Sequence, residues 1–146
     1  MTKSSEDFIE NLVSVNRVLR ARFDARAQDL GLTLSRARLL AHLGREDGRS
    51  QIELAHLLGV SQPSMTALVD GMEKAGLVER RLQGGDRRAR RIFLTRDAQR
   101  HVAELLNVIA EIRESVLRQV SPQDLAVANG ALQRILCNLK DTHQDE

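Results

Sequence analysis

The sequence predicts a mainly α-helical fold that carries one small β-hairpin. Three observations support this prediction. Apolar residues recur at helical spacing along most of the 146 residues, two short apolar stretches favour strands, and a glycine- and arginine-rich loop separates these stretches. The length is typical of a single domain, and helices at both ends remain available for oligomerisation.

The first two predicted helices cover residues 5–30 and 33–44. The first has apolar side chains near helical spacing, and Gly31 is suited to end it. Thr33 is a good N-cap for the second helix, which we expect to close near its final glycine. The charged, glycine-containing stretch 45–50 is predicted to be a loop.

Residues 51–76 predict two short helices joined by a tight turn. In Gly59-Val60-Ser61 the glycine supports the turn, the valine is expected to point inward, and the serine caps the second helix. The apolar stripe of this second helix leaves a short polar face outward. That face consists of Gln62, Ser64, Thr66, Ala67 and Asp70. The pattern favours a helix-turn-helix, although two packed amphipathic helices of any all-α protein would share its periodicity.

A basic hairpin follows the two short helices. Residues 77–82 and 92–94 favour strands and enclose the loop 83–90. Residues 74–100 hold nine Lys and Arg against three Asp and Glu, whereas the rest of the chain holds 13 and 17. This asymmetry is typical of a surface that meets a polyanion, although a solvated basic face would also show it. The loop residues suited to such contacts are Arg87, Arg88 and Arg90, with Asp86 able to hold one arginine in position.

A helix-turn-helix followed directly by a basic hairpin predicts a winged helix-turn-helix that binds DNA. The chain has three phenylalanines and no tryptophan or tyrosine. Proteins that bind single strands or RNA stack the bases on aromatic side chains. The scarcity of aromatic residues therefore favours duplex DNA as the partner.

Two further helices are predicted after the hairpin, within residues 96–140. Thr95 and Ser121 are their N-caps, and the first apolar stripe is expected to extend to Val120. Together with the stripe of residues 5–30, these stripes exceed what a small winged helix can cover. A two-fold partner would cover them in a homodimer, and an intramolecular three-helix bundle is the alternative. The residues expected at the dimer interface are Phe8, Leu12, Leu132, Ile135, Leu136 and Leu139.

Other classes of function find little support in the sequence. The four histidines lie far apart, and paired carboxylates, nucleophile motifs and metal-ligand spacings are absent, so we expect no catalytic, metal or cofactor site. No apolar run reaches the ~20 residues of a membrane span, and the single cysteine, Cys137, fits the cytoplasm. Two alternatives stay open: a redox-responsive regulator that uses Cys137, and a constitutive DNA-binding protein.

Residues 51–95 resemble the MarR family of bacterial transcriptional regulators, particularly its SlyA-like members. The resemblance is carried by L-A-H-L-L-G-V-S-Q-P-S-M-T-A-L-V-D-G-M-E-K-A-G-L-V-E-R and by G-G-D-R-R-A-R-R-I-F-L-T. It implies one MarR-type domain over 1–146, with a DNA-binding part at 33–95 and dimerisation helices at 5–30 and 96–140. Such a homodimer binds pseudo-palindromic duplex DNA, often as a repressor that a small-molecule effector releases.

The resemblance also assigns roles to individual residues. Arg87 or Arg88 would enter the minor groove. The residues that would face the major groove and its phosphates are Ser61, Gln62, Pro63, Ser64 and Thr66.

An effector pocket between the first two helices is a further implication of the resemblance. Arg38 and His42 share a face of the second helix, and Asn16 and Arg20 repeat this spacing on the first. Two arginines and a histidine would favour an anionic ligand, such as the aromatic acids that bind many members. Ala37 stands where the family often has an aromatic side chain, which leaves space in the pocket. Ordinary surface or interface roles for the four polar residues are the alternative.

Overall fold

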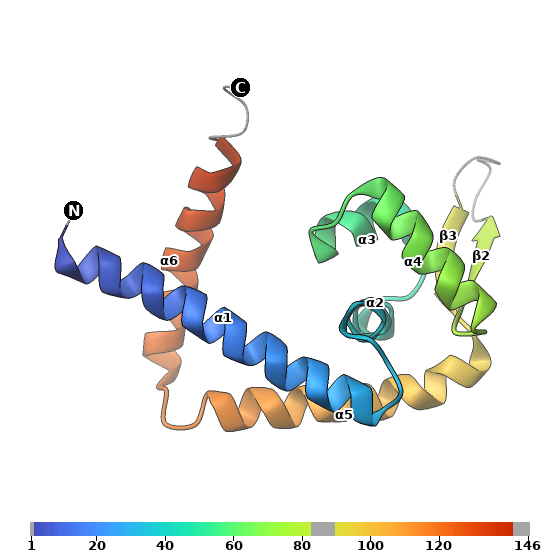
Figure 1. Ribbon diagram of the computed structural model, residues 1–146, viewed down its shortest axis with the longest axis horizontal. Helices are drawn as coiled ribbons and strands as arrows, with labels where there is room; N and C mark the ends of the chain where they lie inside the picture. The colour runs from blue at the N-terminus through green and yellow to red at the C-terminus, as the bar shows by residue number, and fades with distance from the viewer. Residues whose placement is uncertain (1, 83–89, 142–146) are drawn as a thin grey trace. The chain divides into compact units, whose positions relative to one another are not determined.

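The computed structural model describes residues 2–82 and 90–141. The predicted fold class is confirmed: helices dominate, and one antiparallel hairpin lies between them (Figure 1). The chain divides into two compact units, Met1–Ile112 and Arg113–Glu146. The elements in chain order are α1 (Lys3–Asp29), α2 (Leu34–Arg45), β1 (Arg49–Ser50), α3 (Gln51–Leu58), α4 (Gln62–Lys74), β2 (Val78–Leu82), β3 (Arg90–Leu94), α5 (Arg96–Val116) and α6 (Pro122–Asp141).

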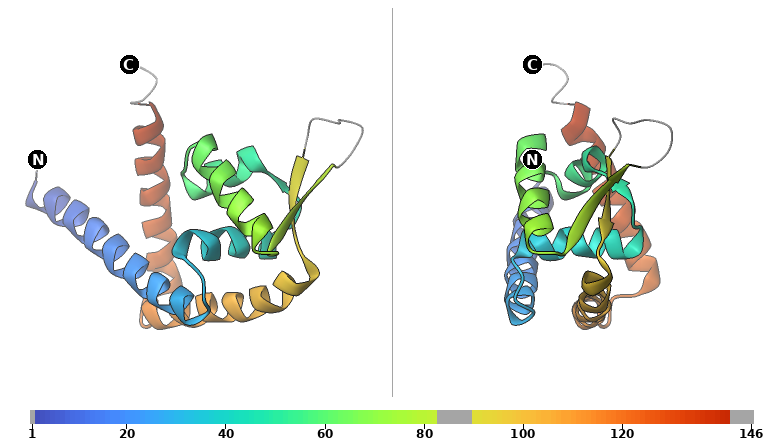
Figure 2. Two further views of the ribbon diagram at one scale, coloured as in Figure 1. Left: turned by 45° about the vertical axis from the view of Figure 1, so that its right-hand side comes forward. Right: turned by 90° about the vertical axis from the view of Figure 1, so that its right-hand side faces the viewer.

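The sheet of the first unit has three antiparallel strands in the order β1-β3-β2. β2 and β3 pair over their full length, with Val78 opposite Leu94, and form the predicted hairpin (Figure 2). β1 pairs with β3 through Arg49 opposite Ile92. The sequence predicts only a loop over 45–50, because a strand of two residues has no periodicity of its own. Its extended pairing is imposed by the neighbouring strand.

Hydroxyl side chains begin the helices where the sequence predicts them. Thr33, Ser61 and Thr95 each accept a hydrogen bond from the backbone N–H three residues later, at the starts of α2, α4 and α5. Ser121 caps α6 in the same way, and its hydroxyl donates to the Asp124 carboxylate 2.8 Å away. These bonds satisfy N–H groups that have no partner within the helix.

The core of the first unit is built from α2, α3, α4, the sheet and α5. Figure 1 views α2 nearly end-on, between the α3–α4 pair and α5. The largest fully buried side chains are Leu39, Leu40, Leu43, Leu54, Met65, Val69, Met72, Val78 and Ile92. Because the apolar stripe of α4 is buried here, the opposite face of α4 is left at the surface.

Gly44 allows α2 and α5 to approach each other closely. A Cβ at this position would lie 2.4 Å from Cγ1 of Val102 and 3.3 Å from Cδ1 of Leu106. The helix closes near Gly44 as predicted, with Arg45 as its last residue. Its second role, which the sequence does not indicate, is to leave room for the side chains of α5.

Three apolar side chains of the helix-turn-helix lie at the surface: Ile52 is 70% exposed, Leu57 39% and Val60 37%. The expected inward direction of Val60 is therefore wrong. Its backbone N–H closes α3 by donating to the carbonyl of Ala55, and the side chain remains half-exposed.

The second unit contains the end of α5 and the whole of α6. α5 ends at Val116, so the apolar stripe stops short of Val120, which the sequence assigned to it. No residue of α6 is buried within this chain. Among the described residues, no helix combines the length and apolar character that crossing a bilayer requires.

Candidate DNA-binding surface and ligand cavity

The first turns of α4 present the predicted polar face to solvent. Ser61, Gln62, Pro63, Ser64 and Thr66 are all exposed. The Ser61 hydroxyl accepts from the backbone N–H of Ser64 at 3.3 Å and donates to the Ser64 hydroxyl at 2.9 Å. Serine at the cap and proline in the first turn therefore start the helix while short polar groups remain on its surface.

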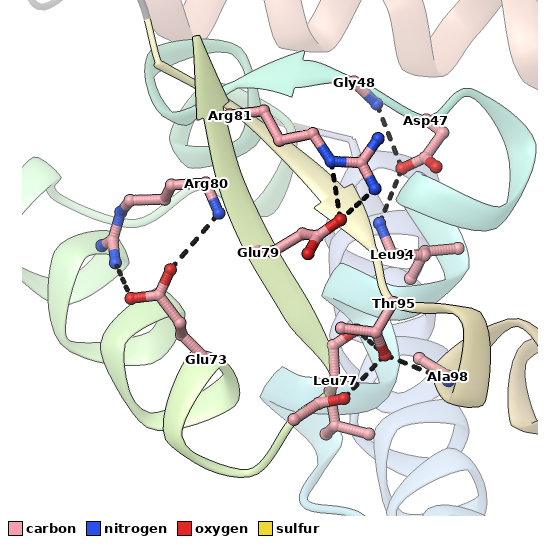
Figure 3. A network of polar contacts seen from close by, with 11 residues as sticks. Asp47, Gly48, Glu73, Leu77, Glu79, Arg80, Arg81, Leu94, Thr95 and Ala98 are labelled. Carbon is pink, nitrogen blue, oxygen red and sulfur yellow. Dashed lines mark hydrogen bonds and ion pairs between the residues drawn. The ribbon is translucent and has the colours of Figure 1, made fainter.

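Arg80 of β2 ties α4 to the hairpin. Its guanidinium lies 2.7 Å from the carboxylate of Asp70 and 3.1 Å from that of Glu73, and its side chain is only 14% exposed. The backbone N–H of Arg80 also donates to Glu73, as Figure 3 shows. Asp70, which the sequence places on the outward face, is thus engaged within the protein. The sequence does not identify this bridge. Two acids three residues apart precede a basic strand, but the distance along the chain from such acids to their arginine follows no fixed rule.

The base of the hairpin is held by hydrogen bonds to the segments that flank it. The Asp47 carboxylate accepts from the backbone N–H groups of Gly48 and Leu94 (Figure 3). The Thr95 hydroxyl donates to the Gly76 carbonyl. The Arg91 guanidinium donates to the Gly48 carbonyl at 2.9 Å. These bonds fix where the hairpin leaves the core, and so fix its position relative to α4.

Of the arginines predicted for the hairpin tip, Arg90 is described and exposed. Arg87 and Arg88 lie outside the described residues, and so does Asp86. Arg81 has partners within the protein: its guanidinium forms an ion pair with Glu79 and lies 4.8 Å from the ring centroid of Phe93.

A cavity of about 390 Å³ lies between α1, α2 and α5 within the first unit. Its size is in the range of small-molecule sites. All four residues predicted for ligand binding line it, namely Asn16, Arg20, Arg38 and His42. Arg45 also lines the cavity, and the sequence analysis did not identify it, although it lies one helical turn after His42. Apolar walls come from Leu19, Phe23, Ala27, Leu34, Ala37, Ala41, Leu105, Val108 and Ile109.

Charge and burial in the cavity act together on His42. Burial, followed by the positive charges of Arg45, Arg38 and Arg49, lowers the pKa of His42 from its ordinary value of 6.5. The imidazole is therefore neutral at pH 7, and the arginines supply the positive charge of the cavity. One of them, Arg38, also donates a hydrogen bond to the carbonyl of Leu58, the last residue of α3, at 3.3 Å.

The six residues expected at the dimer interface divide between the two units. In the first unit, Phe8 is 42% exposed and Leu12 is partly buried. In the second, Leu132 and Ile135 are partly buried on α6, whereas Leu136 and Leu139 are 50% and 58% exposed. Cys137 of the same helix is a free, exposed thiol. Within residues 2–82 and 90–141, no cluster of three His, Cys, Asp or Glu could hold a metal ion.

Comparisons with known proteins agree with this arrangement of elements. Residues 30–89 match the sequence model of the MarR family. The chain is 38% identical to the transcriptional regulator PA3341, over 92% of this chain and 98% of that one, with a TM-score of 0.84. It is 24% identical to AbsC, a MarR family transcriptional regulator from Streptomyces coelicolor, over 97% of each chain, with a TM-score of 0.85. The MepR–DNA complex of S. aureus has the same fold at 19% identity, over 90% of this chain and 97% of that one, with a TM-score of 0.78.

Proposed function

This chain belongs to the MarR family of transcriptional regulators, and on this premise we propose that it is a sequence-specific, duplex-DNA-binding homodimer whose DNA affinity an anionic small molecule lowers. The DNA-binding part would be residues 33–95, and the dimerisation helices would be 5–30 and 96–140. Repression by occupying a pseudo-palindromic operator is the simplest form of such regulation.

The observation that carries the proposal is the exposed polar face of α4 beside the hairpin. A recognition helix reads base edges in the major groove through side chains on its first turns. Gln62 is exposed at the first position of α4, where its amide can bond adenine through two contacts. The basic hairpin, with Arg87, Arg88 and Arg90, would contact phosphates or the minor groove. The DNA-bound structure of MepR gives this use of the fold a precedent.

Support for a homodimer comes from exposed apolar side chains on two helices. On α1, Phe8, Ile9 and Val13 are 42%, 51% and 61% exposed. On α6, which has no buried residue, Val127 is 73% exposed. Apolar surface of this kind on a helix indicates an interface. A two-fold dimer would place two copies of α4 on successive turns of the DNA helix, about 34 Å apart.

Support for an effector comes from the cavity between α1, α2 and α5. Arg20, Arg38 and Arg45 line it together with apolar walls, a combination that suits a small organic anion such as an aromatic carboxylate. The ligand lowers DNA affinity only if it binds a dimer geometry with the wrong α4 spacing more tightly than the DNA-bound geometry.

A binding assay tests the proposal. Wild-type protein is used to select duplexes from a random library and is assayed on DNA upstream of its own gene. Gln62→Ala should weaken binding to the selected duplex by about 1–3 kcal/mol and leave binding to scrambled duplex unchanged. Gln123→Ala, an exposed glutamine of α6 outside the DNA-binding part, is the matched control. Failure to select any sequence, or equal losses on both duplexes, would refute sequence-specific reading by α4.

A further inference from the structure

The hydroxyl of Thr66 on the exposed face of α4 already has two partners inside the protein. It accepts a hydrogen bond from the side-chain amide of Gln51, Nε2 to Oγ1, at 2.6 Å. It donates its own proton to the carbonyl of Gln62, one turn earlier on α4, at 3.0 Å. A hydroxyl has a single proton to donate. The Thr66 hydroxyl therefore has no proton left to donate to a base. The other group that the Thr66 side chain can present to DNA is its methyl.

Gln51 comes from a different helix than Thr66. It is the first residue of α3, partly buried, and it reaches across the helix-turn-helix to α4. In a helix, threonine divides between two side-chain rotamers, because its hydroxyl can bond the carbonyl of the preceding turn. A second hydrogen bond from Gln51 favours the rotamer in which Oγ1 meets both partners. The direction of the Thr66 methyl is thus set by a residue outside the recognition helix.

We propose that Gln51 is a positioning residue for base reading: it holds Thr66 so that the Thr66 methyl recognises the C5-methyl group of a thymine. The inference rests on the proposed insertion of α4 into the major groove, where that methyl group is displayed. It assigns apolar recognition to a residue that would otherwise be taken for a hydrogen-bonding one. It also makes the α3–α4 contact part of the specificity of the protein.

The experiment removes only the methyl group from the DNA. In a duplex selected by the wild-type protein, each thymine is replaced in turn by deoxyuridine, and the dissociation constant is measured by fluorescence anisotropy. At one position in each half of the selected duplex, this replacement should lower the affinity of the protein about fourfold, as expected for burial of one methyl-sized group. Thr66→Ser should remove this dependence, because serine keeps the hydroxyl but lacks the methyl. Thr66→Val should retain it.

The role of Gln51 is separated by a second substitution. Gln51→Met keeps the length of the side chain but cannot donate to Thr66. The thymine-to-uracil ratio, defined as the affinity for the thymine duplex divided by that for the deoxyuridine duplex, should therefore fall to less than about twofold. Binding to scrambled duplex should stay the same. In a Thr66→Val background, which has no hydroxyl to hold, Gln51→Met should change nothing. A thymine-to-uracil ratio unaffected by Gln51→Met, or the absence of any methyl-sensitive thymine, overturns the inference and leaves the proposed function standing. Failure to select any duplex removes the proposed function itself.

Discussion

Arg38 Nη1 lies 3.3 Å from the carbonyl oxygen of Leu58, so that one guanidinium both lines the α1–α2–α5 cavity and closes the C-terminal end of α3. Leu58 immediately precedes Gly59, whose left-handed conformation (φ 67°) begins the turn into α4. A carboxylate bound in the cavity would compete with the Leu58 carbonyl for the same donor. This contact is a direct physical link between the proposed effector site and the helix-turn-helix.

Arg38→Ala combined with His42→Ala should abolish binding of small aromatic carboxylates and the release of DNA that they cause. The double variant removes one of the charges of the cavity and its imidazole. Isothermal calorimetry with benzoate measures the first effect, and a gel shift in the presence of benzoate measures the second. Arg17→Ala, an exposed arginine of α1 that does not line the cavity, is the control. Carboxylate affinity equal to that of the wild type in the double variant would show that the ligand binds elsewhere.

The stability of the protein should depend on pH through His42. The pKa of His42 is lower in the folded chain than its ordinary value of 6.5, so the unfolded state binds more protons between these two pKa values. The free energy of unfolding should therefore decrease as the pH falls below about 6.5. Above this pH, His42 should no longer make the free energy of unfolding depend on pH. Urea unfolding of the wild type and His42→Gln at several pH values provides the test. The variant should lose less stability on acidification, whereas His56→Gln, at an exposed position on α3, should follow the wild type.

Gly44→Ala should destabilise the protein by about 1–3 kcal/mol, although alanine usually favours a helix over glycine. The added Cβ would lie 2.4 Å from Cγ1 of Val102, a buried and rotationally restricted side chain. Val102→Ala in the same chain should recover part of the loss. Gly71→Ala in α4 is the matched control, because its nearest neighbour is the far end of the flexible Arg36 side chain at 3.4 Å. Thermal unfolding distinguishes the variants, and equal melting temperatures for both glycine substitutions would contradict the close contact.

Leu136→Glu should convert the proposed dimer into a folded monomer. Leu136 is 50% exposed in the single chain, so the charge does not enter the core of the protomer. In a dimer it would be buried without a partner, which is strongly unfavourable. Sedimentation gives the mass and circular dichroism the helix content. Gln133→Glu adds the same charge at an exposed position of the same helix and should leave the dimer intact. A dimeric Leu136→Glu protein would place the interface elsewhere.

Arg87→Ala with Arg88→Ala should weaken binding to every duplex and reduce the salt dependence of the binding constant by about one for each lost phosphate contact. If one arginine enters a narrow minor groove instead, the double variant should also lose a preference for A·T-rich flanks. Affinity measured at several salt concentrations distinguishes the two. Arg17→Ala with Arg22→Ala removes the same charge from exposed positions on α1. Unchanged affinity in the hairpin variant would mean that the hairpin makes no contact with DNA.

Much of this fold could be predicted from the sequence because its signals are local. Ser61 and Thr95 cap helices through bonds that span three residues, and the buried stripe of α4 follows from helical periodicity. The exposed face of α4, which includes Gln62 and Thr66, is the other side of the same helix. The sequence by itself thus determined the order of the helices, the presence of the hairpin and the polar residues that α4 exposes.

Only the tertiary structure decided the contacts between elements. The sequence predicts that α2 closes near Gly44, that Asp70 points outward and that residues 45–50 form a loop, but it does not say what these residues contact. In the folded chain Gly44 lies against Val102 of α5, Asp70 pairs with Arg80, and β1 pairs with β3. The cavity brings side chains from α1 and α5 together around α2, and Thr66 receives a partner 15 residues away. Helix caps and periodicity depend on neighbours within about one turn, whereas these contacts depend on how whole helices pack, which local spacing does not record.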